Sequence, residues 1–233
     1  MNKTAVWIII IAILVIGGYM YWGSGSSDVS PADTTGNETG TQMQTAEPVV
    51  NGTYTVVPEQ SIVHWAGKKP LIEGYVDSGT IGVTGGSLTV ADSGTTGTFT
   101  IDMDTLSVTD TPKKPGQESA LEGHLKGDGW FNVAEFPTAT FEITSTAPHA
   151  DVADTHAYDI TGNLTMHGVT NEVTFPAKVY LNSDGNLIAD ASFEIDRTKW
   201  GLTFASGSFF DNLADKVIDD MVALSFELTA TPE

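Results

Sequence analysis

Two clusters of histidine and carboxylate side chains have residue types that suit metal chemistry. His149, Asp151, Asp154 and His156 form the densest group among the five histidines, and four further aspartates lie between positions 211 and 220. Imidazole and carboxylate groups are common ligands of zinc and calcium. Neither cluster has the spacing of a standard zinc site or the alternating order of a calcium-binding loop. We therefore predict no metal ion and interpret both clusters as solvated loops.

Nucleophilic and cofactor-binding signatures are missing from the sequence. Cysteine is absent, which excludes a thiol nucleophile, a disulfide and a thiolate metal site. We also find no Gly-x-Ser-x-Gly elbow, phosphate-binding loop, dinucleotide fingerprint or His-Glu-x-x-His pair. A metal-dependent hydrolase built from scattered histidines stays open as an alternative, because catalytic residues can lie far apart in a sequence. The prediction is a protein without a cofactor that is not an enzyme.

Arg197 and Lys199 are the basic residues best suited to ligand recognition. A guanidinium offers planar donors, so Arg197 could meet an anionic or quinone-like head group. The alternative is an ion pair with a neighbouring carboxylate, because 30 acidic residues face only 10 basic ones. The resulting net charge of -20 repels nucleic-acid phosphates and anionic lipid surfaces. Nucleic acid is therefore not an expected partner.

Residues 1–22 form the segment that decides where these side chains are located in the cell. Lys3 precedes an unbroken apolar run, Ala5 to Trp22, which would span about 27 Å as a helix. We predict a retained single-pass anchor in the cytoplasmic membrane, with the rest of the chain extracytoplasmic. A cleaved signal peptide is the alternative, although no Ala-x-Ala cleavage site follows the run.

Residues 23–48 are rich in Gly, Ser, Thr and acids and contain Val29 and Met43 as their only sizeable apolar residues. Such a segment cannot bury enough surface to fold, so we predict a flexible tether.

Residues 49–233 show the alternation of β-strands and form the predicted folded domain. Phe99, Ile101 and Met103 alternate with polar residues, and several later segments repeat this pattern. Pairs such as Gly85-Gly86 and His167-Gly168 predict turns. Short helical turns are expected only at 118–125 and 211–216. An all-β, antiparallel sandwich or barrel of about eight strands follows, and a barrel could be filled or hollow.

Three sequence motifs carry a resemblance to a known family. They are His124-Leu125 followed by Gly129–Val133 and Phe136–Phe141; Ile160–Thr170, which contains Gly-x-Leu-Thr-x-x-Gly-x-Thr; and Ile195–Gly201, which contains Asp-Arg-x-x-aromatic-Gly, followed by Asp211–Asp220. In this order they resemble the YceI-like lipid-binding family over about residues 51 to 231. The resemblance implies a lipocalin-like eight-stranded barrel that holds an extended isoprenoid-type lipid.

The expected ligand-binding residues are apolar strand residues, aromatic pairs in loops, and the Arg197 segment. They are Phe99, Ile101, Met103, Trp130, Phe131, Phe141, Ile143, Leu164, Phe175, Phe193, Arg197, Trp200, Phe209, Phe210 and Phe226. The strand residues would line the cavity or, alternatively, form an ordinary packed core. The aromatic pairs in loops would guard an opening or plug the barrel end.

The function we expect is extracytoplasmic binding or carriage of a long apolar lipid, such as a polyisoprenoid or a quinone-like molecule. Each buried methylene contributes about 0.8 kcal/mol, so a long chain would bind tightly. The alternative is a filled-barrel structural or interaction module of the cell envelope without a lipid ligand. A monomer and a homodimer are both compatible with the sequence.

Overall fold

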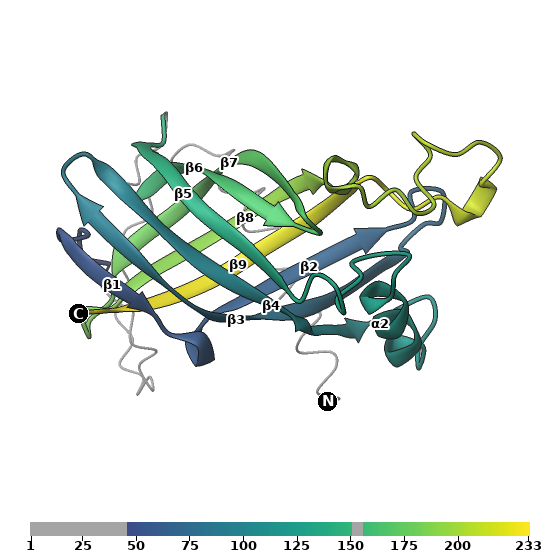
Figure 1. The fold of residues 1–233 in the computed structure, drawn as a ribbon, viewed down its shortest axis with the longest axis horizontal. Coiled ribbons are helices and arrows are strands. Elements are labelled where there is room, and N and C mark those ends of the chain that lie inside the picture. The colour runs from purple at the N-terminus through teal and green to yellow at the C-terminus, as the bar shows by residue number, and fades with distance from the viewer. Residues whose placement is uncertain (1–45, 151–155) are drawn as a thin grey trace, which may run out of the picture. The chain divides into compact units, whose positions relative to one another are not determined.

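The computed structural model describes residues 46–150 and 156–233, which fold as one unit built almost entirely of β-strands (Figure 1). The elements in chain order are β1 (Gly52–Val56), η1 (Pro58–Gln60), β2 (Ile62–Lys68), β3 (Val76–Ala91), β4 (Gly94–Asp110), α2 (Glu118–Lys126), β5 (Thr138–Pro148), β6 (Ala157–Met166), β7 (Val169–Leu181), β8 (Leu187–Asp196), η2 (Arg197–Trp200), η3 (Ala214–Lys216) and β9 (Met221–Pro232).

All strands belong to one antiparallel sheet that closes on itself. Each strand from β3 to β9 pairs with the next one along the chain. Both β1 and β2 pair with β3 on one side and with β9 on the other. The two short strands therefore share one position, interrupted at Pro58, which has no N–H to donate to a ladder. Nine strands thus occupy eight positions, and the prediction of a barrel of about eight strands is confirmed over the sandwich.

The alternation in β4 places its apolar residues inside the barrel. Phe99, Ile101 and Met103 are buried, whereas the side chains between them are more exposed. The buried positions then change from odd to even numbers, continuing at Leu106 and Val108. The pairing with β3 is irregular in the same region. Such an irregularity adds residues to one strand and restores an inward apolar face after a bend.

Gly85-Gly86 is an exception to the predicted turns. The pair lies inside β3, so the prediction of a turn there is wrong. A register shift occurs between Val83 and Gly85, and Gly85 has a φ of 145°. A Cβ at Gly86 would lie 2.6 Å from the Phe99 Cα. Glycine is therefore needed for a bulge and for close approach of two backbones, which sequence punctuation does not distinguish from a turn.

The two ends of the barrel carry loops of different length. At one end, called the α2 end, the chain connects β2 to β3, β4 to β5, β6 to β7 and β8 to β9, including the long segments 111–137 and 197–220. At the opposite end the β3–β4 connection is the two-residue turn Asp92-Ser93. The longest connections among the described residues therefore lie at the α2 end (Figure 1).

Helical structure is sparse, as the strand pattern predicted. α2 and η3 lie within or next to the two expected helical segments. Within 46–150 and 156–233, the structure has no helix of the length and apolarity needed to cross a membrane. The predicted anchor, 1–22, and most of the predicted tether lie outside the described residues. Glu47, at the end of that tether, forms a β-bridge with Leu181.

Candidate functional site

Five phenylalanines from five strands meet in the middle of the barrel interior. We call this set the phenylalanine partition; it consists of Phe99, Phe141, Phe175, Phe193 and Phe226. Phe175 is its centre, because its ring centroid lies 5.5 Å from that of Phe141, 4.1 Å from that of Phe193 and 5.6 Å from that of Phe226. Aromatic rings at such separations attract one another beyond their burial.

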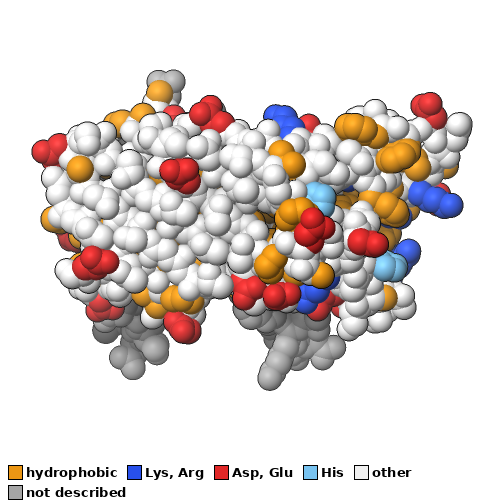
Figure 2. All heavy atoms as spheres, viewed as in Figure 1, with side chains coloured by type: hydrophobic (Ala, Val, Ile, Leu, Met, Phe, Trp, Pro, Cys, Tyr) orange, Lys and Arg blue, Asp and Glu red, His pale blue; other side chains and the backbone are white. Residues whose placement is uncertain are grey.

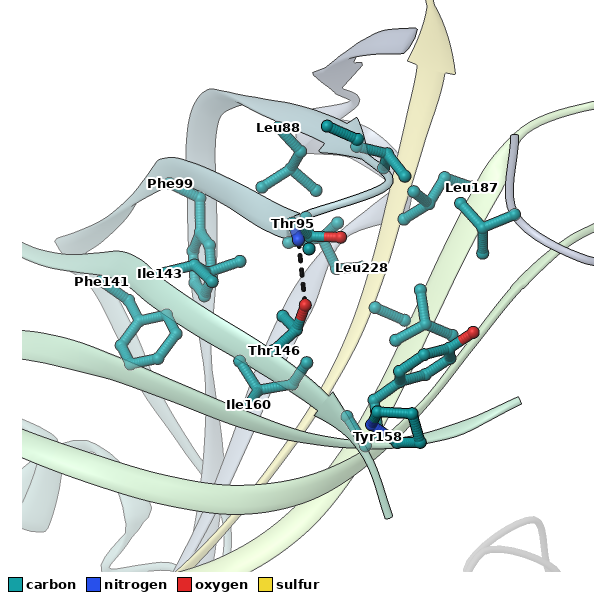
Figure 3. A pocket seen from close by; sticks show the side chains of 18 of the residues that line it. Leu88, Thr95, Phe99, Phe141, Ile143, Thr146, Tyr158, Ile160, Leu187 and Leu228 are labelled. Atoms are coloured by element: carbon teal, nitrogen blue, oxygen red, sulfur yellow. Dashed lines mark hydrogen bonds between the residues drawn. The ribbon is translucent and has the colours of Figure 1, made fainter. Parts of the chain in front are cut away.

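A cavity of about 320 Å³ lies on the side of the partition that faces the opposite end. We call it the opposite-end cavity. Leu88, Ile160 and Leu187 point into it from different strands (Figure 3). Its rim contains the β3–β4 turn and is held by a hydrogen bond from the Thr95 backbone N–H to the Thr146 hydroxyl, at 2.9 Å. The cavity therefore has an apolar wall and a more polar rim.

A second cavity, of about 150 Å³, lies toward the α2 end and is called the α2-end cavity. Strand residues such as Ile101 and Leu224 form its wall. Leu121 and Leu125 of α2 contribute from the connection that covers this end, and Ile218 contributes from the 197–220 segment. Figure 2 shows hydrophobic side chains gathered on the surface at this end.

Arg197 is a charged residue in the wall of the α2-end cavity, and the 197–220 segment accepts most of its hydrogen bonds. Its side chain is 2% exposed. Nε donates to the Asp219 carbonyl at 3.0 Å, Nη2 donates to the Ile218 carbonyl at 3.1 Å, and Nη1 donates to the Leu202 carbonyl. Nη2 also lies 3.3 Å from Asp220 Oδ1. Burial lowers the pKa of Arg197, although the nearby carboxylates oppose this change. The guanidinium thus holds the start of the segment to its end, because Arg197 is its first residue and Ile218, Asp219 and Asp220 are among its last.

Asp77 is a second charged residue in the same wall. Its Oδ1 is buried and has no hydrogen-bond partner among the described residues. Burial raises the pKa of the carboxyl, whereas Lys114 and Lys69 act in the opposite direction. The wall of the α2-end cavity, which also includes Lys68 and Lys69, therefore contains a guanidinium whose donors are largely satisfied and a carboxylate oxygen that has no hydrogen-bond partner among the described residues.

The structure distributes the fifteen predicted ligand-binding residues among three places. Five line the opposite-end cavity: Phe99, Phe141, Ile143, Phe175 and Phe226. Six line the α2-end cavity: Ile101, Met103, Trp130, Phe131, Leu164 and Arg197. Four line neither: Phe193, Trp200, Phe209 and Phe210.

The four residues outside the cavities have different surroundings. Phe193 stacks on Phe175 within the partition. Trp200 is 1% exposed, and its indole N–H donates to the Leu164 carbonyl at 3.0 Å. Phe209 and Phe210 are 58% and 50% exposed. The structure therefore does not bring this last aromatic pair into either cavity.

Sequence reasoning missed the small side chains and the loop side chains that complete the cavities. Ala189 lines the opposite-end cavity, and Ala139 and Leu202 line the α2-end cavity. Asp77 was also missed, although a signal was available. It lies at an odd position of β3, in phase with the buried residues Ile81 and Val83, so the alternation points its side chain inward.

The predicted histidine–aspartate cluster is only partly described. His149 Nδ1 lies 2.6 Å from Asp159 Oδ1, and Asp151 and Asp154 fall outside the described residues. Among the residues that the structure does describe, no group of three or more His, Asp or Glu side chains is arranged to hold a metal ion.

A closed antiparallel barrel with apolar space inside is an architecture that encloses small ligands. Comparison with protein families agrees with a ligand-enclosing barrel. The YceI-like domain profile matches residues 54–230, and the chain belongs to that family. The protein YceI of Salmonella arizonae is 39% identical over 94 residues, which is 38% of this chain and 47% of that relative. This alignment spans about half the length of the curated relatives that it matches.

Two solved structures show the same fold. BcnA from Burkholderia cenocepacia has a TM-score of 0.57 at 22% identity, over 76% of this chain and 99% of that chain. A polyisoprenoid binding domain from Saccharophagus degradans has a TM-score of 0.54 at 18% identity, over 77% of this chain and 98% of that chain.

Proposed function

We propose that the barrel binds one long apolar lipid, such as a polyisoprenoid or a quinone-like molecule, and carries it outside the cytoplasmic membrane. The observation that carries this proposal is apolar space on both sides of the phenylalanine partition, about 320 Å³ and 150 Å³. Ordinary protein interiors are close-packed and contain few voids larger than a water molecule. Space of this size inside a small domain therefore favours a ligand over a packed core.

Three further observations support the proposal. Ligand pockets of small molecules measure about 300 to 1,000 Å³ and are mainly apolar, which the opposite-end cavity fits. The similar domain from Saccharophagus degradans is a polyisoprenoid binding domain. The apolar run at 5–22 supports an extracytoplasmic location. Binding rather than catalysis is the role proposed, because both cavities have mainly apolar walls. The donors of Arg197, in the wall of the α2-end cavity, are already engaged with carbonyls of the 197–220 segment.

A structural or interaction module of the cell envelope is the second candidate. The phenylalanine partition favours it, because these rings occupy the middle of the barrel and separate the two cavities. A lipid longer than one cavity must displace at least one of these rings. Lipid binding therefore requires the phenylalanine rings to move apart, whereas a structural or interaction module keeps them in place.

Mass spectrometry of organic extracts from gently purified protein tests the proposal. We expect about one lipid per chain in the wild type, and loss of that lipid in Ile101→Trp, which fills the α2-end cavity, or in Ala189→Trp, which fills the opposite-end cavity. If the space is real, both variants should melt close to the wild type, whereas overpacking of a filled core costs about 1 to 3 kcal/mol.

Thr100→Trp is the matched control, because Thr100 lies on β4 beside Ile101 and faces the other side of the sheet. It should keep the lipid. Recovery of no lipid from any sample, together with a large drop in melting temperature for both cavity variants, would favour the structural module instead.

A further inference from the structure

Asp77 is an acidic residue on the inward face of β3, which is otherwise apolar near this end of the strand. Gly79, Ile81 and Val83 of β3 are buried, and Asp77 precedes them at the same phase. Asp77 is half-buried and lines the α2-end cavity together with Tyr75, which is buried. A carboxylate in such a place costs free energy unless a hydrogen-bond donor reaches it.

The donors that surround Asp77 leave one of its oxygens unsatisfied. The side chain of Tyr75 interacts with the carboxyl group and lowers its pKa. Lys69 Nζ lies over the Tyr75 ring, 5.1 Å from its centroid. Lys114 attracts the carboxylate and Asp110 repels it, both through space. After these contacts, Asp77 Oδ1 is buried without a hydrogen-bond partner among the described residues.

We propose that Asp77 Oδ1 accepts a hydrogen bond from the hydroxyl group of an uncharged lipid alcohol whose chain lies in the α2-end cavity. This inference rests on the proposed lipid-binding function and specifies the head group. A carboxylate is an acceptor, so it pairs with a ligand O–H group and cannot pair with a quinone oxygen, which is also an acceptor. A prenyl phosphate would place a second negative charge beside Asp77.

Arg197 does not reverse this preference. It shares the cavity wall with two other cations, Lys68 and Lys69. The Arg197 donors contact the carbonyls of Leu202, Ile218 and Asp219. Lys68 Nζ lies 3.3 Å from Asp219 Oδ2, and Lys69 Nζ lies over the Tyr75 ring, so each cation already has a contact. A phosphate could recruit Arg197 only by taking donors from the 197–220 segment. A hydroxyl group on Asp77 leaves the Arg197 contacts in place and needs only a movement of the Asp77 side chain that brings Oδ1 to the cavity surface.

Binding of three matched fifteen-carbon probes tests the proposal. The probes are farnesol, farnesyl methyl ether and farnesyl phosphate, measured with the full chain by competition against a fluorescent fatty alcohol. We expect the wild type to bind farnesol roughly tenfold tighter than the ether, since a hydrogen bond to a charged group contributes at least that ratio. The phosphate should bind more weakly than farnesol.

Asp77→Leu removes the acceptor and should reduce the farnesol-to-ether ratio to about one while leaving the affinity for the ether nearly unchanged. Glu194→Leu is the matched control, because Glu194 is an exposed carboxylate on a strand, and it should keep the ratio. If Asp77→Leu does not fold, Asp77→Asn retains a neutral acceptor and should give an intermediate ratio.

The outcomes separate the two proposals. Failure of all three probes to bind the wild type overturns lipid binding itself. Equal binding of farnesol and the ether by the wild type, a ratio that survives Asp77→Leu, or a preference for the phosphate overturns the role of Asp77 and leaves lipid binding in place.

Discussion

The opposite-end cavity and the α2-end cavity have the same kind of wall but different covers. Alternating apolar residues of the strands line both. The opposite-end cavity has a rim that includes the turn Asp92-Ser93. The α2-end cavity lies beneath the 111–137 and 197–220 segments and contains Arg197 and Asp77. Strand alternation thus supplies general apolar affinity at either end. Side chains that could contact a head group lie at both ends, Arg197 and Asp77 in the α2-end cavity and Asp92 and Tyr158 in the opposite-end cavity, so the clearest difference between the two cavities is what covers them.

Loop length explains this difference in physical terms. A two-residue turn can reverse a strand but cannot reach across a barrel mouth. A segment of about twenty residues can cross the mouth, provided that its backbone polar groups find partners. Arg197 supplies such partners to three carbonyls of the 197–220 segment. Three substitutions each test one part of this comparison. They remove the Arg197 hydrogen bonds, open the phenylalanine partition, or neutralise Asp77.

Arg197→Met should have the largest effect, because it removes a donor from three carbonyl groups and the ion-pair partner from Asp220. Loss of one member of a buried ionic network costs about 3 to 5 kcal/mol. We expect this loss in the free energy of unfolding measured with urea. Amide exchange should accelerate at 201–220 before it does so in the strands around the opposite-end cavity.

Lys199→Met is the control for that variant, because Lys199 is exposed and shares the same helical turn. It should change stability by less than about 0.5 kcal/mol. A similar loss of stability in both variants would contradict the stabilising role of the Arg197 hydrogen bonds.

Phe175→Leu should have an intermediate effect, since it removes three carbons from the centre of the phenylalanine partition. At about 0.8 kcal/mol per methylene, the expected loss of stability is roughly 2 kcal/mol. Removal of the ring connects the two cavities, so the longest prenol that binds should gain several carbons relative to the wild type. Binding measured for a series of prenols with chains of about ten to forty carbons would determine this limit.

Leu181→Ala is the control for the partition. Leu181 is buried, lines neither cavity and also loses three carbons. It should lower stability without changing the chain-length limit. An unchanged limit in Phe175→Leu would mean that the rings do not restrict the ligand.

Asp77→Asn should have the smallest effect on stability, and its sign should depend on pH. Burial raises the pKa of the Asp77 carboxyl, with Lys114 and Lys69 opposing. A raised carboxyl pKa means that the folded state favours the protonated form, so this contribution to stability is present below the unfolded pKa and is lost as pH rises through the folded pKa. Relative to the wild type, Asp77→Asn should therefore become more stable between acidic and neutral pH, by less than about 1 kcal/mol.

Urea unfolding of both proteins at several pH values would measure the difference. If the wild type instead gains stability over Asp77→Asn as pH rises, the nearby cations stabilise the ionised form of Asp77 by more than burial destabilises it.

Local periodicity was enough to predict much of the fold. The period of two at Phe99, Ile101 and Met103 predicted one buried face, because successive side chains of a strand point to opposite sides. The helical turn expected at 118–125 is also present, as α2. Sequence reasoning failed at Gly85-Gly86, because a glycine pair has the same sequence signature in a turn as in a bulge.

The division of the interior depended on contacts between residues far apart in the chain. Phe99 and Phe226 lie 127 positions apart yet have ring centroids 6.2 Å apart, and no local pattern predicts which five rings meet. The partners of Arg197 likewise come from a loop that the barrel must first bring into place. Sequence specified which side chains face inward, because that is a property of one strand. Closure of eight strand positions determined where those side chains leave space, and it buried one carboxylate oxygen, Asp77 Oδ1, without a hydrogen-bond partner among the described residues.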